Sequence, residues 1–315
     1  MGAERHEKLR DADVLVVGAG GLAAPALQYL VGAGIGEITV LDQDVVDLTN
    51  LHRQTLFREY DIGQPKAQAA TRHLQQLNAD CKITPIRGVL DPSNAEDLCC
   101  GRDIVLDCAD SFAASYILSD TCQQAAIPLI SASVIGLEGY CGGFCGTSPS
   151  LRAVFPDLPQ RAGSCAEDGV LGPVVGVIGA IQAQMAVAVL AGIAPSPLGQ
   201  LVTFDAQNFR FGRFRFDGAP EEAGGPQFIA ARDIRTGDFV IDLRSAEEPG
   251  PKLPEALRVS VPEIGIEGPQ PAAGQRAVLA CRSGFRAWQA ADRLKSVWDG
   301  EIKLVALGDT QGEQE

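Results

Sequence analysis

The first half of the chain alternates short apolar runs with longer amphipathic stretches. Residues 14–17 read Val-Leu-Val-Val, and after a glycine-containing turn an Ala- and Leu-rich stretch continues to about residue 33. A short β-branched run bounded by glycine predicts a buried strand, and the longer stretch predicts a helix. The same analysis predicts strands at 38–41, 82–87, 104–107 and 128–133, and helices at about 65–78 and 113–126. This order predicts an α/β fold in which helices cover both faces of a mainly parallel sheet.

The turn after the first predicted strand has the features of a nucleotide site. Gly18 permits the tight turn, Gly20 lets the backbone approach a phosphate, and Ala23 stands at the third glycine position of the motif. Free N–H groups at the start of the predicted helix favour phosphate oxygens. Asp42 ends the next predicted strand, close to the usual offset (~20 residues) of the acid that binds ribose hydroxyls. The pattern predicts a Rossmann-like nucleotide site; a tight turn that binds nothing is the alternative.

The pattern then changes. Residues 139–147 are Gly-rich and predict an antiparallel strand, and residues 148–172 carry the many Pro and Gly residues of a long loop. The apolar stretch 174–191 predicts a helix that packs in the core or at a subunit interface. Two more strands are predicted at 201–204 and 209–216. The alternation of Phe and Arg in the second of them predicts one buried and one solvated face.

A Pro- and Gly-rich segment at 217–227 predicts a linker between two domains. The first domain is expected to span residues 1–216 and the second residues 228–315. In the second domain, apolar runs at 239–244 and 277–280 predict strands, and a helix is expected to follow the latter run. We therefore expect a Rossmann-like domain followed by a smaller α/β domain.

The charge balance excludes one class of function. The 315 residues include 26 Lys and Arg against 40 Asp and Glu, which gives a formal net charge of −14. A general nucleic-acid binder carries a basic face, so no nucleic-acid partner is expected.

The cysteines and the N-terminal sequence indicate a compartment. The N-terminal sequence has no signal peptide, and the apolar stretches are expected to be too short to span a bilayer, so no membrane partner is expected. The nine cysteines are an odd number, which favours reduced thiols in the cytoplasm. Cys141 and Cys145 are expected to pack in the interior, with a metal or a mutual bond as the alternative. The sequence has no C-x-x-C pair, so no structural zinc is expected.

Polar motifs after the second predicted strand favour a triphosphate over a nicotinamide cofactor. Arg53 and Lys66 supply cations suited to a triphosphate. Asp110 supplies an oxygen ligand suited to Mg²⁺ bridging phosphates. Because the glycine turn, Asp42 and Asp110 all follow predicted strands, one crevice can hold all three. An NAD-dependent oxidoreductase would give Arg53, Lys66 and Asp110 no role.

These motifs resemble the ThiF/MoeB/HesA family, E1-like enzymes that adenylate the C-terminal glycine of ubiquitin-like sulfur carriers. The resemblance covers about residues 7–215 and includes Gly-Gly-Leu, Leu-Asp-x-Asp, Asn-Leu-x-Arg-Gln, Gly-Gln-Pro-Lys, Asp-Cys-x-Asp and Glu-Gly. It implies an ATP site made of Gly18, Gly20, Gly21, Asp42, Asp44, Asn50, Arg53, Lys66, Asp110 and Ser111. Within this set it implies that Asp42 binds the ribose and Asp110 binds Mg²⁺. It implies that Asn50, Arg53 and Lys66 hold the triphosphate and polarise the α-phosphate.

A first cysteine loop indicates sulfur chemistry. Residues 163–173 match the mobile cysteine loop of the same family, which implies that Cys165 is its conserved cysteine. As a thiolate, Cys165 would attack an acyl adenylate or an acyl disulfide. An inert loop cysteine is the alternative.

A second cysteine loop, at 281–286, resembles the active-site loop of a rhodanese. In such a loop backbone N–H groups point at the sulfur, and this resemblance implies that Arg282, Ser283, Gly284 and Arg286 hold a persulfide on Cys281. The arginines and the helix start are expected to lower the pKa of the Cys281 thiol. A cysteine in a tight turn with arginines nearby is the alternative.

The sequence departs from these families in three ways. Many relatives bind zinc through two C-x-x-C pairs, which would fall near 151–154 and 217–222, and neither segment contains cysteine. The family usually begins with an extra helix whose arginine reaches the partner subunit's ATP, whereas this chain is expected to start almost directly at its first strand. Arg5 is the one nearby candidate. Thirdly, Ser111 replaces the usual Asn after Asp110, and Ala23 replaces a Gly; the rhodanese-like region is also short.

The sequence therefore predicts an adenylyltransferase that is also a sulfurtransferase. Its expected substrates are ATP, with Mg²⁺, and a ubiquitin-like sulfur carrier that ends in Gly-Gly. A cysteine desulfurase or another sulfane-sulfur donor is expected to load Cys281, and a homodimer is expected from the resemblance and from the apolar stretch 174–191. The alternative is a non-catalytic E1-like scaffold that binds nucleotide and partner.

Overall fold

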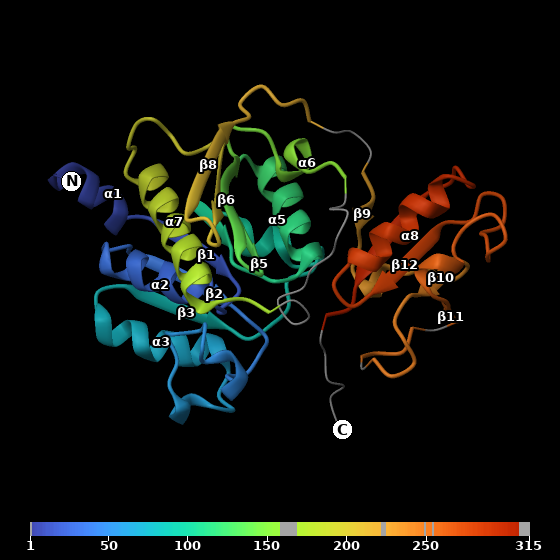
Figure 1. Cartoon of the computed structure of the whole chain (residues 1–315), viewed down its shortest axis with the longest axis horizontal. Coiled ribbons are helices and arrows are strands. Elements are labelled where there is room, and N and C mark those ends of the chain that lie inside the picture. The colour runs from blue at the N-terminus through green and yellow to red at the C-terminus, as the bar shows by residue number, and fades with distance from the viewer. Residues whose placement is uncertain (1, 158–168, 222–224, 249, 254, 309–315) are drawn as a thin grey trace.

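The computed structural model describes residues 2–157, 169–221, 225–248, 250–253 and 255–308. Its first sheet has eight strands in the order β3-β2-β1-β4-β5-β6-β7-β8 (Figure 1). The strands from β3 to β5 pair in parallel, and β6, β7 and β8 continue the sheet antiparallel. The strands are β1 Asp13–Val17, β2 Glu37–Leu41, β3 Lys82–Ile86, β4 Ile104–Asp107, β5 Pro128–Ile135, β6 Glu138–Cys145, β7 Gln200–Asp205 and β8 Arg210–Arg215. The predicted Rossmann-like, mainly parallel sheet is confirmed.

Helices cover both faces of this sheet. The helices are α1 Ala3–Arg10, α2 Ala23–Gly32, α3 Lys66–Leu77, α4 Ala95–Cys99, α5 Phe112–Ala125, α6 Leu151–Val154 and α7 Gly172–Leu190. Successive residues of β1 point to opposite faces. Val14 therefore packs in the cluster formed with α2, α3 and α7, whereas Leu15 packs in the cluster formed with α4 and α5.

A second sheet follows in the chain, with five parallel strands in the order β11-β10-β12-β13-β9. The elements are β9 Gln227–Phe228, β10 Phe239–Asp242, β11 Leu257–Arg258, β12 Ala277–Cys281, α8 Phe285–Lys295 and β13 Ile302–Ala306. Trp288 of α8 and Leu279 of β12 belong to the same apolar cluster as Leu15 of the first sheet. The two sheets thus share a continuous apolar core on the α5 side.

Helix α7 is long and strongly apolar. It packs against α2, β5 and β6, as the core alternative for residues 174–191 predicted. By length and composition alone this helix could cross a membrane, so the expectation that every apolar stretch is too short is wrong. Just over half (56%) of its apolar window is buried inside the protein.

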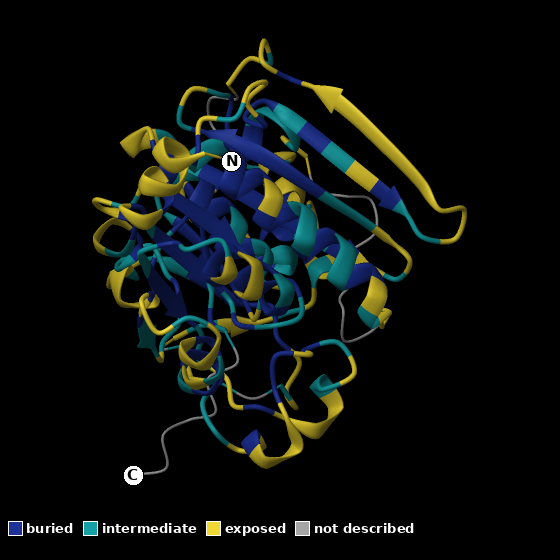
Figure 2. Ribbon diagram, turned by 90° about the vertical axis from the view of Figure 1, so that its left-hand side faces the viewer, coloured by how far each residue is buried: buried dark blue, intermediate teal, exposed yellow. Residues whose placement is uncertain are grey.

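Two local expectations are wrong. All six residues of β8 are exposed, so its alternating Phe and Arg residues do not produce one buried face (Figure 2). The reason is that β8 is the last strand of the sheet and lies beyond the helices. The expected direct start at the first strand is also wrong, because α1 precedes β1 and carries Arg5. Leu9 is the one buried residue of that helix, and its sequence has little apolar periodicity from which a helix could have been predicted.

Candidate functional site

The glycine turn lies where the carboxyl ends of β1, β2 and β4 meet. Val17 pairs with Leu41 of β2 and with Asp107 of β4. Gly18 has a positive φ of 94°, and a Cβ at this position would lie 2.6 Å from the carbonyl oxygen of Cys108. Only glycine fits this approach, so the backbone after β4 runs directly against the turn.

Asp42 holds the turn from the end of β2. Its Oδ2 accepts a hydrogen bond from the Ala19 N–H at 2.7 Å, and its Oδ1 accepts one from the Asp44 N–H at 2.7 Å. Burial raises the pKa of Asp42, and the charge of Lys66 and the two N–H groups oppose this rise. The predicted ribose ligand therefore lies at the glycine turn, where it also fixes the turn's conformation.

The segment around Arg53 and the start of α7 lie over the glycine turn. A Cβ on Gly21 would lie 2.7 Å from Cγ1 of Val175 and 3.3 Å from the carbonyl oxygen of Arg53. A Cβ on Gly20 would be less crowded, because its nearest atom is Nε2 of Gln54 at 3.6 Å. The turn is thus enclosed at Gly21 and more open at Gly20, as a backbone that approaches a phosphate requires.

Gln54 is a site residue that the sequence analysis quoted without assigning it a role. Its side chain is 4% exposed, and its Oε1 has no hydrogen-bond partner among the described residues. A buried amide oxygen without a partner costs free energy, so such an atom indicates a place where a ligand or water donates. This orphaned atom beside Gly20 fits a nucleotide site.

The two predicted cations are each paired within the chain. Nζ of Lys66 lies 2.8 Å from Oδ2 of Asp44, and Lys66 is 5% exposed at the start of α3. Nη1 of Arg53 lies 2.8 Å from Nε2 of His52 and 3.3 Å from the carbonyl oxygen of Thr49. The structure therefore brings Lys66 together with the predicted site residue Asp44, whereas Arg53 contacts its own segment.

The polar segment that carries Asn50 and Arg53 is a compact turn tied to α3. It begins with a 3₁₀ helix, Leu48–Asn50, and the backbone N–H groups of Arg53 and Gln54 both donate to the carbonyl oxygen of Asn50. Farther along, buried Asp61 accepts hydrogen bonds from Arg72 and His73 of α3 at 3.1 and 2.7 Å. These contacts set the segment's position over the glycine turn.

Asp110 and Ser111 follow β4 and precede α5. Asp110 is exposed, and Ser111 is the N-cap residue of α5, although its side chain makes no capping hydrogen bond. Asp107, three residues earlier, is fully buried and accepts a hydrogen bond from Ser131 Oγ at 2.7 Å, and burial raises its pKa to about 6. Of the two acids, Asp110 is the one free to meet a solvent-borne cation.

Gln182 of α7 is a further residue that the sequence analysis missed. Its Nε2 donates to the carbonyl oxygens of Asp107 and Ile130 at 2.7 and 3.0 Å, and the Cys108 thiol donates to its Oε1 at 3.3 Å. The two glutamines of this apolar helix, Gln182 and Gln184, were a signal available in the sequence, because a Gln that is buried in such a helix needs hydrogen-bond partners. Gln182 therefore fixes α7 to the strand ends that precede Asp110.

Cys281 ends β12 and begins the predicted persulfide loop. Its Sγ accepts hydrogen bonds from the backbone N–H groups of Gly284 at 3.2 Å and Ala287 at 3.4 Å. Gly284 has a positive φ of 85°, which turns the loop into α8. The N–H groups thus point at the sulfur as expected, and Arg282 remains exposed while Arg286 is half-buried.

The electrostatics of Cys281 differ from the expectation. Burial raises the pKa of the Cys281 thiol, although backbone N–H groups and the charge of Arg286 oppose the rise. Arg286 cannot act fully on the sulfur, because it makes a bidentate ion pair with Glu248 at 2.5 and 2.6 Å. The predicted lowering of this pKa is therefore wrong for the structure described.

Cys165 lies outside the described residues. The two segments in which relatives carry zinc ligands do meet, through polar contacts of the protein itself. The backbone N–H of Ser150 and its hydroxyl donate to the Glu221 carboxylate at 2.7 and 2.6 Å. Among the described residues there is no group of three or more side chains that could hold a metal ion.

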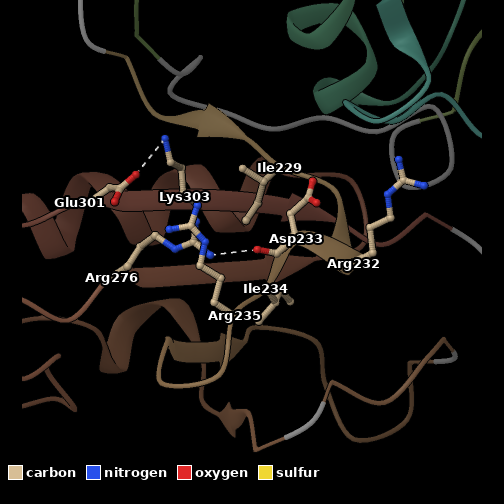
Figure 3. A pocket seen from close by; sticks show the side chains of 8 residues that line it. All are labelled: Ile229, Arg232, Asp233, Ile234, Arg235, Arg276, Glu301 and Lys303. Carbon is tan, nitrogen blue, oxygen red and sulfur yellow. Dashed lines mark hydrogen bonds and ion pairs between the residues drawn. The ribbon is translucent and has the colours of Figure 1, made fainter. Parts of the chain in front are cut away.

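An open pocket of about 500 Å³ lies on the second sheet, away from the glycine turn (Figure 3). Four cationic side chains (Arg232, Arg235, Arg276 and Lys303) and two acidic ones (Asp233 and Glu301) line it, with two isoleucines. Arg276 forms an ion pair with Asp238 at 2.6 Å, and Lys303 lies 3.1 Å from Glu301. The lining thus carries more cationic than acidic side chains, and the pocket lies apart from the glycine turn.

A glycine turn, an acid after the second strand and a further acid after the fourth define a nucleotide-binding α/β protein. The chain belongs to the ThiF family, whose family model matches residues 1–224.

Several curated relatives match about two thirds of the chain. The SAMP-activating enzyme E1 of Haloferax volcanii is 38% identical over 213 residues, which are 67% of this chain and 79% of that protein. The molybdopterin-synthase adenylyltransferase of Salmonella typhimurium is 40% identical over 210 residues, which are 66% of this chain and 84% of that protein. The adenylyltransferase and sulfurtransferase MOCS3 of Xenopus laevis is 39% identical over 221 residues, 69% of this chain. The chain spans about half the length of the MOCS3 relatives, 49% in this case.

Solved structures share the fold. The crystal structure of E. coli MccB with ATP matches with a TM-score of 0.60 and 22% identity, over 68% of this chain and 67% of that one. An identity this low supports the fold alone.

Proposed function

We propose that this chain uses ATP to adenylate the C-terminal glycine of a ubiquitin-like sulfur carrier and then transfers sulfur to that carboxyl group from Cys281. One observation carries the first step. The glycine turn, Asp42 and the Lys66–Asp44 pair meet at adjoining strand ends in a chain of the ThiF family. The names of the adenylyltransferase relatives support the reaction type.

In the adenylation step, a carboxylate oxygen of the carrier attacks the α-phosphorus of ATP. The bond between the α-phosphorus and the oxygen that bridges it to the β-phosphate breaks, and pyrophosphate leaves with that oxygen. Negative charge grows on the α-phosphate oxygens, and fixed cations stabilise it. We infer that Lys66 exchanges Asp44 for phosphate, and that Arg53 turns from His52 to the same group. Because Lys66 is buried, its charge acts through a poorly screening medium.

The residues present fit Mg²⁺. Asp110 offers an exposed carboxylate, which is the kind of oxygen ligand that this ion prefers. It follows β4, the strand that pairs with β1 next to the glycine turn. When bound, the ion neutralises phosphate charge. Asp110 is therefore assigned to hold the ion, and Ser111 and Asn50 to contact the phosphates.

For sulfur transfer, we infer that residues 228–315 form a rhodanese-like domain, joined through 217–227 to an E1-like domain at 1–216. The N–H groups directed at Cys281 Sγ support this assignment. A sulfane-sulfur donor, such as a cysteine desulfurase persulfide, passes its outer sulfur to the Cys281 thiolate. The terminal sulfur then attacks the acyl adenylate, AMP leaves, and an acyl disulfide remains.

The remaining chemistry is assigned to Cys165. Its thiolate attacks the sulfur of Cys281, which breaks the S–S bond and releases the thiocarboxylate. A Cys165–Cys281 disulfide results, and an external dithiol reduces it. We further infer that the protein acts as a cytoplasmic homodimer.

A second candidate function is a non-catalytic scaffold that binds nucleotide and carrier. The observation that favours it is that Lys66 and Arg53 are already paired, with Asp44 and His52. A scaffold would keep its carrier affinity when Lys66 is replaced, whereas an enzyme would lose turnover.

The test is ATP–pyrophosphate exchange with ubiquitin-like proteins that end in Gly-Gly from the same genome. The proposal predicts exchange that depends on the carrier and disappears when its final glycine is deleted. Absence of exchange with every such carrier, while nucleotide still binds, would favour the scaffold.

A further inference from the structure

The loop that carries Cys281 packs directly on the first turn of α5. The Ala113 N–H donates a hydrogen bond to the Ser283 carbonyl oxygen at 3.0 Å. A Cβ on Gly284 would lie 2.9 Å from Cβ of Ala113, so the two backbones fit closely. Since α5 begins directly after Asp110 and Ser111, this contact brings the persulfide loop to the edge of the nucleotide site.

Aromatic side chains from both sheets surround this contact. The Phe112 ring lies edge-on to Phe285 and Trp288, with centroids 5.5 and 5.4 Å apart, and the Tyr116 centroid lies 4.8 Å from that of Trp288. Edge-to-face pairs at these distances are attractive beyond the burial of their area. Phe112 and Tyr116 belong to α5, so they form the face on which α8 rests.

Arg152 of α6 closes the same junction. Its guanidinium lies 5.1 Å from the Tyr116 ring centroid and 5.2 Å from that of Trp288. It also binds Asp120 through two hydrogen bonds of 2.6 and 2.8 Å, and it donates to the Pro226 carbonyl oxygen just before β9. Arg152 thus joins α5, α6, α8 and the chain that leads into the second sheet.

One buried hydrogen-bond donor in this junction lacks a partner. Nη1 of Arg152 is buried and has no hydrogen-bond partner among the described residues. A buried charged donor without a hydrogen-bond partner destabilises the folded state, and exposure to water removes that penalty because water then accepts the hydrogen bond. A backbone hydrogen bond from the Ala113 N–H to the Ser283 carbonyl oxygen links the Cys281 loop to α5. These features favour a contact that can open.

Cys281 is inaccessible in the docked arrangement. Its relative exposure is 0%, and Gly284, whose N–H donates to its Sγ, is buried against Phe228 of β9 and Ala113 of α5. A sulfur donor must reach Sγ of Cys281 to pass on a sulfur atom. The docked arrangement therefore fits delivery to the nucleotide site and does not fit loading.

We propose that Phe112, Tyr116 and Arg152 form a docking surface whose occupant is the α8 and Cys281 loop region of the same chain. Release of this contact exposes Cys281 to the sulfur donor, and docking returns its loop to the Asp110 side of the nucleotide site. This inference rests on the sulfur-transfer role proposed for Cys281.

The experiment measures N-ethylmaleimide labelling of individual cysteines in the full chain by peptide mass spectrometry. Cys100 is exposed and serves as the freely reacting reference, and Cys141 is buried in the first sheet and reports global unfolding. In the unmodified protein we expect Cys281 to react at least tenfold more slowly than Cys100 and at least tenfold faster than Cys141. Equal rates for Cys281 and Cys100 would show that no docking occurs in solution. Equal rates for Cys281 and Cys141 would show that the contact never opens alone, and either result overturns the proposal.

Variants then locate the contact. We expect Phe112→Ala and Arg152→Leu each to raise the Cys281 rate at least tenfold without raising the Cys141 rate. Phe211→Ala, on exposed β8, is the matched control and should change neither. An unchanged Cys281 rate in both docking variants would overturn the proposal. Labelling needs neither ATP nor a carrier, so a failure of adenylation leaves this result interpretable.

Discussion

Nζ of Lys66 lies 2.8 Å from Oδ2 of Asp44, and this pair joins the buried start of α3 to the surface beyond β2. The lysine side chain is 7% exposed and the aspartate side chain 51%. The cation is therefore held in a site of low polarity, while its partner can be displaced into water. Such a pair is suited to exchange a carboxylate for a phosphate.

Replacing Lys66 tests this exchange. In Lys66→Met the cation is lost and the side-chain volume is kept, so transition-state charge on the α-phosphate goes unstabilised. We expect carrier-dependent pyrophosphate exchange to fall by about 10²–10³-fold. Lys303→Met, a cation of the second sheet, is the control and should leave exchange unchanged. A Lys66→Met protein with full exchange would remove Lys66 from the mechanism.

Asp110→Asn tests the assignment of the metal ligand. An amide oxygen binds Mg²⁺ more weakly than a carboxylate, and the residue is exposed, so the fold should not change. We expect the Mg²⁺ concentration that gives half-maximal exchange to rise about tenfold or more, with an unchanged melting temperature. The same Mg²⁺ dependence as in the unmodified protein would show that another group holds the ion.

Gly18→Ala tests the close approach of the glycine turn to the end of β4. The substitution adds a Cβ that would lie 2.6 Å from the Cys108 carbonyl oxygen at a positive φ of 94°. We expect it to lower the free energy of unfolding by about 3 kcal/mol. Gly63 has a similar φ of 82°, but a Cβ there meets no described atom within 4 Å. Gly63→Ala should therefore cost only about 1 kcal/mol, and equal losses in urea unfolding would contradict the clash.

The glycine turn and its surroundings were predictable because their information is local. The run Val14 to Val17, the glycines and Asp42 each have a direct conformational reason to stand where they do. Their convergence follows from the parallel order of the strands. The pairing of Lys66 with Asp44 was not predictable, because it depends on where the loop between them returns to the sheet.

Other features depend on contacts between distant segments. The alternation in β8 predicted a buried face, but burial needs a covering element, and β8 lies at the sheet edge. The expectation of a lowered pKa for Cys281 was based only on the arginines and the helix start of its own loop. Burial of the thiol inside the folded chain raises its pKa and outweighs the loop's N–H groups and Arg286. Short elements such as α4, β9 and β11 have too few residues for a periodic pattern.

The Arg286–Glu248 ion pair predicts a pH dependence. Hydrogen bonds from Arg286 lower the pKa of Glu248 from its ordinary value of 4.5 to about 2. Because the folded state favours the ionised carboxylate, its stabilising contribution is present above about pH 4.5 and is lost as the pH falls toward 2. We expect Glu248→Gln to flatten the fall of the melting temperature over this range. Glu59→Gln, at an exposed position, is the control. Identical profiles for Glu248→Gln and the unmodified protein would contradict the pair's contribution.

The most direct measurement is a crystal structure of the protein with a non-hydrolysable ATP analogue and Mg²⁺. The account predicts phosphates over Gly20 and Gly21, ribose hydroxyls on Asp42, Lys66 turned from Asp44 to a phosphate oxygen, and the ion on Asp110. A nucleotide bound at any other place on the chain would contradict it.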